Sequence, residues 1–149
     1  MKYSVEVIIE KPIDEVIEKF SDPNNLSKWQ PGLQSTKQLE GKPGAVGAKQ
    51  QMNYLMGKRK VEMIETITVN DLPREFSAIY VAKKVWNQSK NFFATNQHGQ
   101  TVYFAENEFQ FKGMIKVIGW VMPGMFKKET LKYMTYFKDF VENGTNASS

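Results

Sequence analysis

Apolar and polar side chains alternate over the first ten residues of the chain. The apolar positions of one face are Tyr3, Val5, Val7 and Ile9, and Ile8 is the one exception on the other face. A period of two is typical of a strand that buries one of its faces. The sequence therefore predicts a half-buried strand at the beginning of the chain.

The period changes to that of a helix after this strand. Apolar side chains fall at i, i+3, i+4 and i+7, at Ile13, Val16, Ile17 and Phe20. Asp14 and Glu15 suit the positive N-terminal end of such a helix. Ser21-Asp22-Pro23 ends it and begins a second short helix, in which Leu26 and Trp29 are the expected buried residues.

Strands and turns follow from about residue 33 to residue 112. Turn residues cluster at 41–44, 56–58, 70–73 and 96–99, where Gly, Asn, Asp and Pro are concentrated. Segments rich in Val, Ile, Thr, Phe and Tyr lie between them. The pattern predicts six strands at roughly 8–12-residue spacing, which indicates a continuous antiparallel meander.

The last predicted element is a long amphipathic helix from Met125 to Val141. Its apolar stripe is Phe126, Thr130, Tyr133, Phe137 and Val141, and charged residues occupy the opposite side. We expect one domain over residues 1–142 and a disordered polar tail over residues 143–149. The fold class is α+β: a curved antiparallel sheet of about seven strands around the long helix, with two short helices after the first strand.

This architecture predicts an internal cavity. A strongly bent sheet and a straight helix do not close completely on each other, so apolar space remains between them, and small molecules bind in such concave sites. The expected lining residues are Met52, Tyr54, Met63, Glu65, Ile67, Trp86, Phe93, Tyr103, Asn107, Phe109, Trp120, Met122, Phe126, Tyr133 and Phe137. Among the eight methionines, those that reach the cavity give a deformable wall.

Composition narrows the possible chemistry. There is no cysteine and only one histidine, which excludes disulfides, thiolate metal sites and multi-histidine metal sites. We therefore expect no metal and no cofactor. The net charge of +4 is spread over short basic clusters, including Lys83-Lys84, which are interpreted as solvated turns or helix faces, so we expect no nucleic-acid partner.

The same sequence gives an expectation for location. The first residues carry charges where a signal peptide needs an apolar run, and no apolar stretch is long enough to span a bilayer, so a cytoplasmic location is the default expectation. The segment 117–126 has basic flanks and suggests at most a transient membrane contact, although burial against the sheet is the simpler interpretation. The oligomeric state, monomer or homodimer, stays open.

Glu65 is the weak candidate for a catalytic residue. It lies in the row with Val61, Met63, Ile67 and Val69, which should face inward. A carboxylate in that environment can act as a general acid or base, but it can also lie at the pocket mouth or pair with a neighbour.

Asn107 and His98 are the other polar candidates. Asn107 shares the inward row of the last strand and can orient a ligand, or satisfy Glu65 or the backbone. His98 falls in a predicted turn without a supporting catalytic pattern, so we expect an exposed turn residue.

The chain resembles the SRPBCC superfamily, whose fold is called START-like or helix-grip and whose members include polyketide cyclases and lipid-transfer domains. The resemblance lies in residues 9–16, 20–23, 26–29, 102–104 and 109–113 and in the closing helix, and the element order matches over about residues 1–142. It implies a pocket for a lipid, sterol, polyketide or hormone, and in some members catalysis of cyclisation. It carries over no catalytic residue.

Three functions follow as alternatives. The first is binding or transport of a small hydrophobic molecule, such as a lipid, a polyketide or an aromatic metabolite. The second is a cyclase, dehydratase or hydrolase that uses Glu65. The third is a protein-interaction module resembling the Aha-type co-chaperone domains, which a filled interior and an exposed apolar patch would favour.

Overall fold

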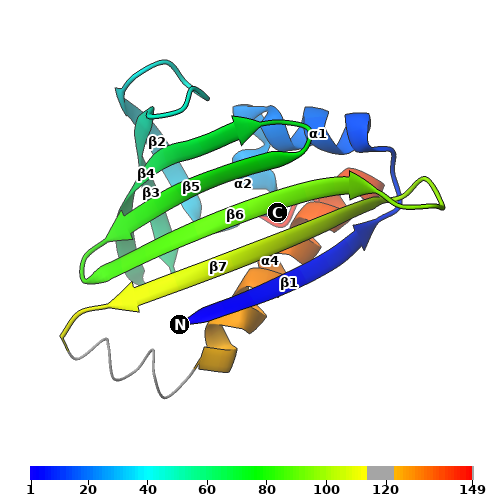
Figure 1. Cartoon of the computed structure of the whole chain (residues 1–149). Helices are drawn as coiled ribbons and strands as arrows, with labels where there is room; N and C mark the ends of the chain where they lie inside the picture. Colours follow the sequence, from blue (N-terminus) through cyan, green and yellow to red (C-terminus); the bar gives the residue numbers. More distant parts are fainter. Residues whose placement is uncertain (114–122, 149) are drawn as a thin grey trace.

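The computed structural model describes residues 1–113 and 123–148. Seven strands form one antiparallel sheet in the order β1-β7-β6-β5-β4-β3-β2 (Figure 1). The strands are β1 (Lys2–Ile9), β2 (Leu33–Glu40), β3 (Lys49–Met56), β4 (Arg59–Asp71), β5 (Glu75–Ala82), β6 (Val85–Thr95) and β7 (Thr101–Phe111). The six strands after the first helices form the predicted meander.

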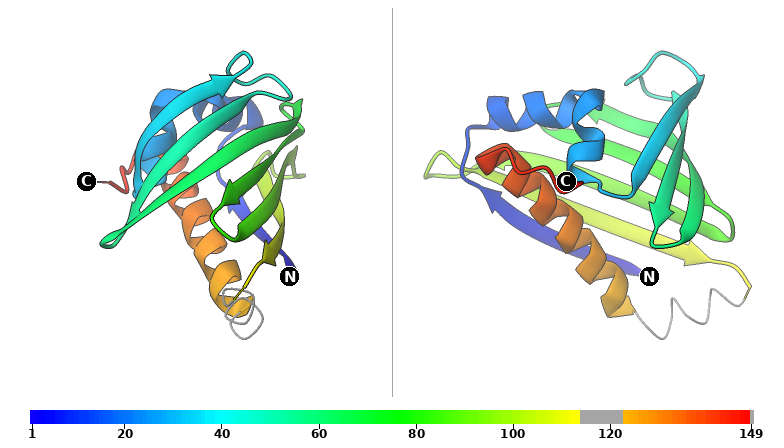
Figure 2. Two further views of the ribbon diagram at one scale, coloured as in Figure 1. Left: turned by 90° about the vertical axis from the view of Figure 1, so that its left-hand side faces the viewer. Right: turned by 180° about the vertical axis from the view of Figure 1, so that it is seen from behind.

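The helices lie on the concave side of this sheet. They are α1 (Ile13–Ser21), the short 3₁₀ turn η1 (Pro23–Asn25), α2 (Leu26–Trp29) and α4 (Pro123–Asn143). Figure 2 shows the sheet curving around α4, with α1 and α2 at one end. The predicted helix-grip arrangement is confirmed. Helix α4 begins two residues before the predicted helix and ends two residues after it.

Irregularities in strand pairing accompany the curvature of the sheet. In β4 the register with β5 shifts between Ile67 and Val69. A bulge of this kind bends a strand and reverses the alternation of its side chains. Val69 consequently pairs with Ser77 on the convex side, whereas Asn70 borders the concave space. The expectation that Val69 faces inward with Glu65 was therefore wrong.

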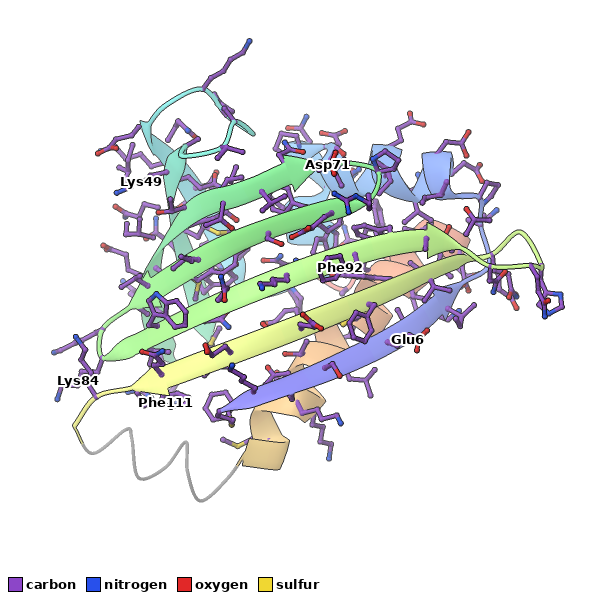
Figure 3. The ribbon with its side chains drawn as sticks, viewed as in Figure 1. Glu6, Lys49, Asp71, Lys84, Phe92 and Phe111 are labelled. Atoms are coloured by element: carbon purple, nitrogen blue, oxygen red, sulfur yellow. The ribbon has the colours of Figure 1, made fainter. Side chains whose placement is uncertain are left out.

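The turn between β5 and β6 consists of Lys83 and Lys84 alone. Ala82 pairs with Val85. Figure 3 labels Lys84 at this turn, and its φ is 63°. Two-residue hairpin turns need such positive φ values, for which Gly, Asn and Asp are the usual residues. The pair was interpreted only as a solvated turn or helix face because none of those residues marks it.

One half of the concave space is filled by an apolar core. Its buried residues are Val5, Ile9, Val16, Trp29, Phe93, Tyr103, Ala105, Met134, Phe137, Phe140 and Val141. The ring centroids of Phe93 and Tyr103 are 4.7 Å apart, and those of Trp29 and Phe137 are 5.0 Å apart. Phe137 is fully buried, with 0% of its surface exposed. The C-terminal half of α4 is therefore held by aromatic packing.

Polar contacts fix α4 against β1. The Tyr3 hydroxyl lies 2.6 Å from Thr130 Oγ1, and Lys138 Nζ donates to the Ile8 carbonyl at 2.7 Å. Glu142 Oε2 accepts from the Glu10 amide at 2.7 Å and lies 2.5 Å from Lys138 Nζ. Burial opposes the charged form of Glu142, but the Glu10 amide and Lys138 outweigh it and lower the pKa of this carboxyl.

The residues after α4 contact α2. The Ala147 amide donates to the Lys28 carbonyl at 2.8 Å, and the Ser148 hydroxyl donates to the Ser27 carbonyl. The domain boundary at residue 142 and the disordered tail stay predictions. None of the helices in the described part of the chain is long and apolar enough to cross a membrane.

Candidate ligand cavity

A cavity of about 1230 Å³ occupies the other half of the concave space. Its floor is the inner face of strands β3 to β7, and its roof includes the first half of α4. The apolar side chains in its wall include Met52, Tyr54, Met63, Ile67, Tyr103, Phe109, Met125, Phe126, Tyr133 and Met134. The volume exceeds the roughly 300–1,000 Å³ of ordinary ligand pockets. The space therefore suits a molecule of substantial size.

A polar row crosses the floor of this cavity, with one residue from each of four neighbouring strands. Gln50 of β3 pairs with Glu65 of β4, Glu65 with Tyr80 of β5, and Tyr80 with Asn87 of β6. Paired residues of antiparallel strands point to the same side of the sheet, so the four side chains are neighbours on the floor. We name these four residues the polar row.

Glu65 is the centre of the polar row. Its Oε1 accepts from the Gln50 side-chain amide at 2.8 Å, and its Oε2 accepts from the Tyr80 hydroxyl at 2.8 Å. Only 6% of the residue is exposed. Glu65 thus lines the cavity and also forms hydrogen bonds with its neighbours. The sequence had left these two predictions as alternatives.

The hydroxyls of the cavity tyrosines are held in the neutral form. Burial raises the pKa of Tyr80 well above its ordinary value, and the negative charge of Glu65 and the hydrogen bond to it add to this effect. Burial, followed by the charge of Glu65, likewise raises the pKa of Tyr54, whose hydroxyl donates to Gln30 Oε1 at 2.6 Å. Both groups are therefore hydrogen-bond donors at neutral pH.

Amide side chains continue the polar surface toward β7. Asn87 Nδ2 donates to Asn107 Oδ1 at 3.2 Å and to the Glu108 carbonyl at 3.1 Å. Farther along β6, Asn91 Oδ1 accepts from the Tyr103 hydroxyl at 2.9 Å. Asn107 thus pairs with Asn87 and not with Glu65. The result is an apolar cavity with polar groups concentrated on one wall.

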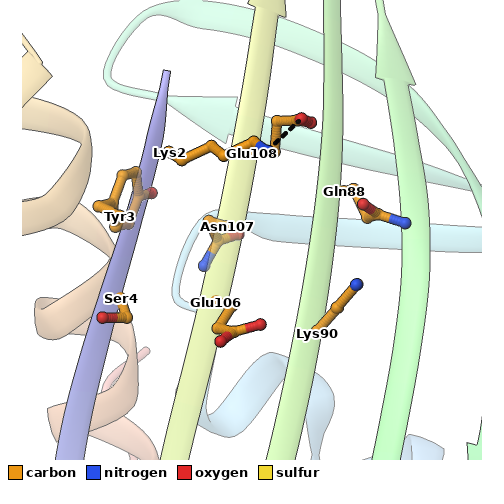
Figure 4. A pocket seen from close by; sticks show the side chains of 8 residues that line it. All are labelled: Lys2, Tyr3, Ser4, Gln88, Lys90, Glu106, Asn107 and Glu108. Carbon is orange, nitrogen blue, oxygen red and sulfur yellow. Dashed lines mark ion pairs between the residues drawn. The ribbon is translucent and has the colours of Figure 1, made fainter.

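A second and smaller hollow, of about 350 Å³, lies on the opposite side of the sheet (Figure 4). Its lining residues are largely charged or polar, and most of them occupy outward positions of β1, β6 and β7. Lys2 and Glu108 form an ion pair there at 3.7 Å, and the Lys2 side chain is 80% exposed. Exposed pairs of this kind contribute little to stability or binding. The internal cavity is therefore the stronger candidate for a binding site.

Most of the residues that the sequence assigns to the ligand site line the internal cavity. They are Met52, Tyr54, Met63, Glu65, Ile67, Tyr103, Asn107, Phe109, Phe126 and Tyr133. Trp120 and Met122 lie outside the described residues, as does most of the segment 117–126. His98 is exposed in the turn between β6 and β7, as expected.

Three of the assigned residues do not line the cavity. Trp86 pairs with Val81 and Gln110 on the convex face. Phe93 and Phe137 point to the concave side but are buried in the apolar core, with 3% and 0% of their surfaces exposed. The assignment of Trp86 conflicts with strand alternation, because residues 86 and 93 differ by an odd number and cannot share a face.

Sequence reasoning missed the polar members of the wall. Gln50, Tyr80, Asn87, Ser89 and Asn91 all line the cavity. Strict alternation back from Phe93 would have placed residues 91, 89 and 87 inward, so the signal was present in β6. These residues were not assigned to the cavity because its lining was expected to be hydrophobic, whereas these inward side chains of β6 are amides and a hydroxyl.

The described residues hold no group of three or more His, Cys, Asp or Glu side chains that could bind a metal ion. The polar residues in the described wall of the cavity are the carboxylates Glu65 and Glu129, Lys49, several neutral phenols and several amides. Such groups can orient a ligand through hydrogen bonds, or exchange a proton with it.

Solved structures with the same fold have low sequence identity to this chain. A conserved protein from Geobacillus kaustophilus aligns with a TM-score of 0.78 at 17% identity, over 95% of each chain. The Zhui aromatase/cyclase from Streptomyces gives 0.78 at 12% identity, over 100% of this chain and 98% of that one. The structure titled Ara h 8.0201 gives 0.75 at 15% identity, over 95% and 97%. These likenesses establish the fold alone.

No curated protein sequence matches the chain. The model of one protein family, described as polyketide cyclase / dehydrase and lipid transport, matches residues 1–137. This match and the shared fold confirm the resemblance to the SRPBCC superfamily. The chain belongs to the polyketide cyclase / dehydrase and lipid transport family.

Proposed function

We propose that the protein binds a small, mainly apolar molecule inside the cavity. The observation that carries this proposal is the cavity itself, with its volume of about 1230 Å³ between α4 and the sheet. Protein interiors are normally packed as densely as organic crystals, with few voids larger than a water molecule. A concave and mainly apolar space of this size, open to the surface beside a densely packed core, is typical of small-molecule binding sites.

The composition of the wall supports the same proposal. Methionine and aromatic side chains provide apolar contact, and the polar row gives that contact a fixed orientation. Flexible thioethers such as Met52 and Met63 adapt to an irregular ligand surface. The aligned aromatase/cyclase and the family description make a lipid or a polyketide a reasonable class of ligand.

A cavity-filling substitution tests the proposal. We expect Ser89→Trp to weaken binding of the neutral fluorescent probe N-phenylnaphthylamine by roughly tenfold, because the indole would occupy the floor. Gln88→Trp is the matched control, since Gln88 is the adjacent residue and lines the outer hollow. Probe fluorescence and native mass spectrometry of the purified protein provide the measurements. Equal binding by wild type and both variants would contradict the proposal.

A second candidate function is acid–base catalysis inside the cavity, of the cyclase, dehydratase or hydrolase type. The hydrogen bond of 2.8 Å between Tyr80 and Glu65 favours it, because a carboxylate and a neutral phenol form a proton donor and acceptor on the wall. Chemical comparison of the ligand extracted before and after incubation with the protein would detect such a reaction.

The protein-interaction alternative has less support. It would be favoured by a filled interior, but a cavity of about 1230 Å³ lies between the sheet and α4. Exposed apolar side chains such as Leu55, Met56 and Met125 occur at the cavity rim, where they border the ligand site. The same residues are accounted for by ligand entry, so they do not require a protein partner.

A further inference from the structure

Glu65 forms no ion pair within the part of the chain that the structure describes. The residue is 6% exposed, and its two oxygens accept from the neutral groups of Gln50 and Tyr80. A carboxylate removed from water without a cation is unfavourable, and neutral hydrogen bonds offset only part of this cost.

The other charged groups of the described wall do not offset the charge of Glu65. The described wall also contains Glu129, on α4, and one lysine, Lys49. Glu129 lies 4.0 Å from Lys132, and both side chains are more than half exposed. Lys49 lies between the inward positions of Ala48 and Gln50, so strand alternation directs it to the other face of β3. The floor around Glu65 is therefore negative.

The neighbours of Glu65 suit a cation as well. The Tyr80 hydroxyl donates to Glu65 Oε2 at 2.8 Å, so the phenol of Tyr80 lies next to the carboxylate. Tyr80 and Glu65 both line the cavity. Cations bind favourably against aromatic faces and next to carboxylates, and an ionised carboxylate has about four acceptor positions, of which two are occupied here.

We propose that the ligand has an apolar body that ends in a protonated amine, and that this ammonium group binds Glu65 beside Tyr80. The proposal rests on the proposed ligand-binding function and specifies its chemistry. An ammonium group supplies both the hydrogen-bond donors and the missing positive charge. A hydroxyl supplies only a donor, and a carboxylate adds a second negative charge, so both are disfavoured.

Three ligands with one shared chain test this assignment: decylamine, decanol and decanoate. Their affinities are measured at pH 7.5 by displacement of N-phenylnaphthylamine. We expect decylamine to bind wild-type protein about tenfold or more tightly than decanol, with decanoate the weakest, because a charge-assisted hydrogen bond is stronger than a neutral one. In Glu65→Gln, which keeps the shape and the acceptor oxygen, the preference for decylamine should disappear.

Glu62→Gln is the matched control, since it removes the same charge from an exposed position three residues away on β4. Its preference for decylamine should equal that of wild type, and thermal unfolding verifies that both variants fold. Equal affinity of wild type for decylamine and decanol, or a preference that survives in Glu65→Gln, would overturn the assignment while leaving ligand binding intact. Failure of the probe and of all three ligands to bind would overturn both proposals.

Discussion

The two halves of the concave face have the same fold elements but opposite interiors. On the side of β1 and α1, aromatic and branched side chains such as Val16, Phe93 and Phe137 fill the space. On the side of β3 to β5, side chains such as Glu65 and Tyr80 border an empty volume of about 1230 Å³. Helix α4 spans both halves: Phe137, Phe140 and Val141 are buried near its C-terminal end, whereas its first half borders the cavity.

The difference shows how one face of a sheet can pack against a hydrophobic core at one end and line a cavity at the other. Helix α1 brings Val16 and Phe20 into the filled half, where Phe20 lies 5.0 Å from Phe93 between ring centroids. In the other, open half, Leu26 of α2 packs against a smaller buried cluster of Leu33, Met52 and Tyr54, and small residues such as Ser89 occupy part of the floor. Most of the buried apolar side chains of the described core therefore lie in the filled half.

The largest expected effect follows from this division along α4. Phe137→Ala should lower the free energy of unfolding by about 3–5 kcal/mol, because it leaves a void in a packed core. Tyr133→Ala, one turn earlier on the same helix, removes a side chain that already borders empty space and should cost about 1 kcal/mol. Urea denaturation measures both values. Similar losses at the two positions would show that the halves do not differ in packing.

An intermediate effect is expected where the chain closes over the open half. The Tyr54 hydroxyl donates to Gln30 Oε1 at 2.6 Å and so links β3 to the segment after α2. Tyr54→Phe should lower the free energy of unfolding by about 1 kcal/mol, the ordinary net value of one hydrogen bond. Tyr133→Phe is the control, because the described residues offer its hydroxyl no hydrogen-bond partner. Equal melting temperatures of the two variants would argue against this link.

The same comparison explains what the sequence could predict. Periods of two and 3.6 locate the strands and helices, since every element must bury one face, whether it faces core or cavity. The division between core and cavity depends on long-range packing. The sequence predicts Phe93 and Phe137 as lining residues. Both are buried in the core instead, because α1 packs over this half of the concave face.

Local exceptions account for the remaining errors. The bulge after Ile67 reverses the face of Val69, and no glycine or proline marks it in the sequence. The turn at Lys83 and Lys84 likewise lacks the residues that normally reveal a hairpin. The sequence could predict only part of the polar row. To place Gln50, Glu65 and Tyr80 side by side, one must know the register of three strands, which periodicity alone does not provide.

The smallest expected effect concerns Glu142 near the C-terminal end of α4. Its carboxylate accepts from the Glu10 amide and pairs with Lys138. Because the folded state lowers the pKa of Glu142 below its ordinary value of 4.5, the ionised carboxylate stabilises the fold at neutral pH. This contribution is lost as the pH falls below 4.5 and the carboxyl takes up a proton. Glu142→Gln should therefore lower stability at pH 7 by about 1 kcal/mol or less, and the difference from wild type should shrink in acid. Urea denaturation at several pH values measures it, and a difference that grows in acid would mean that the Glu10 and Lys138 contacts do not favour the charged form. A loss much smaller than that of Phe137→Ala would also indicate that aromatic packing stabilises the contact of α4 with the sheet more than the contacts of Glu142 do.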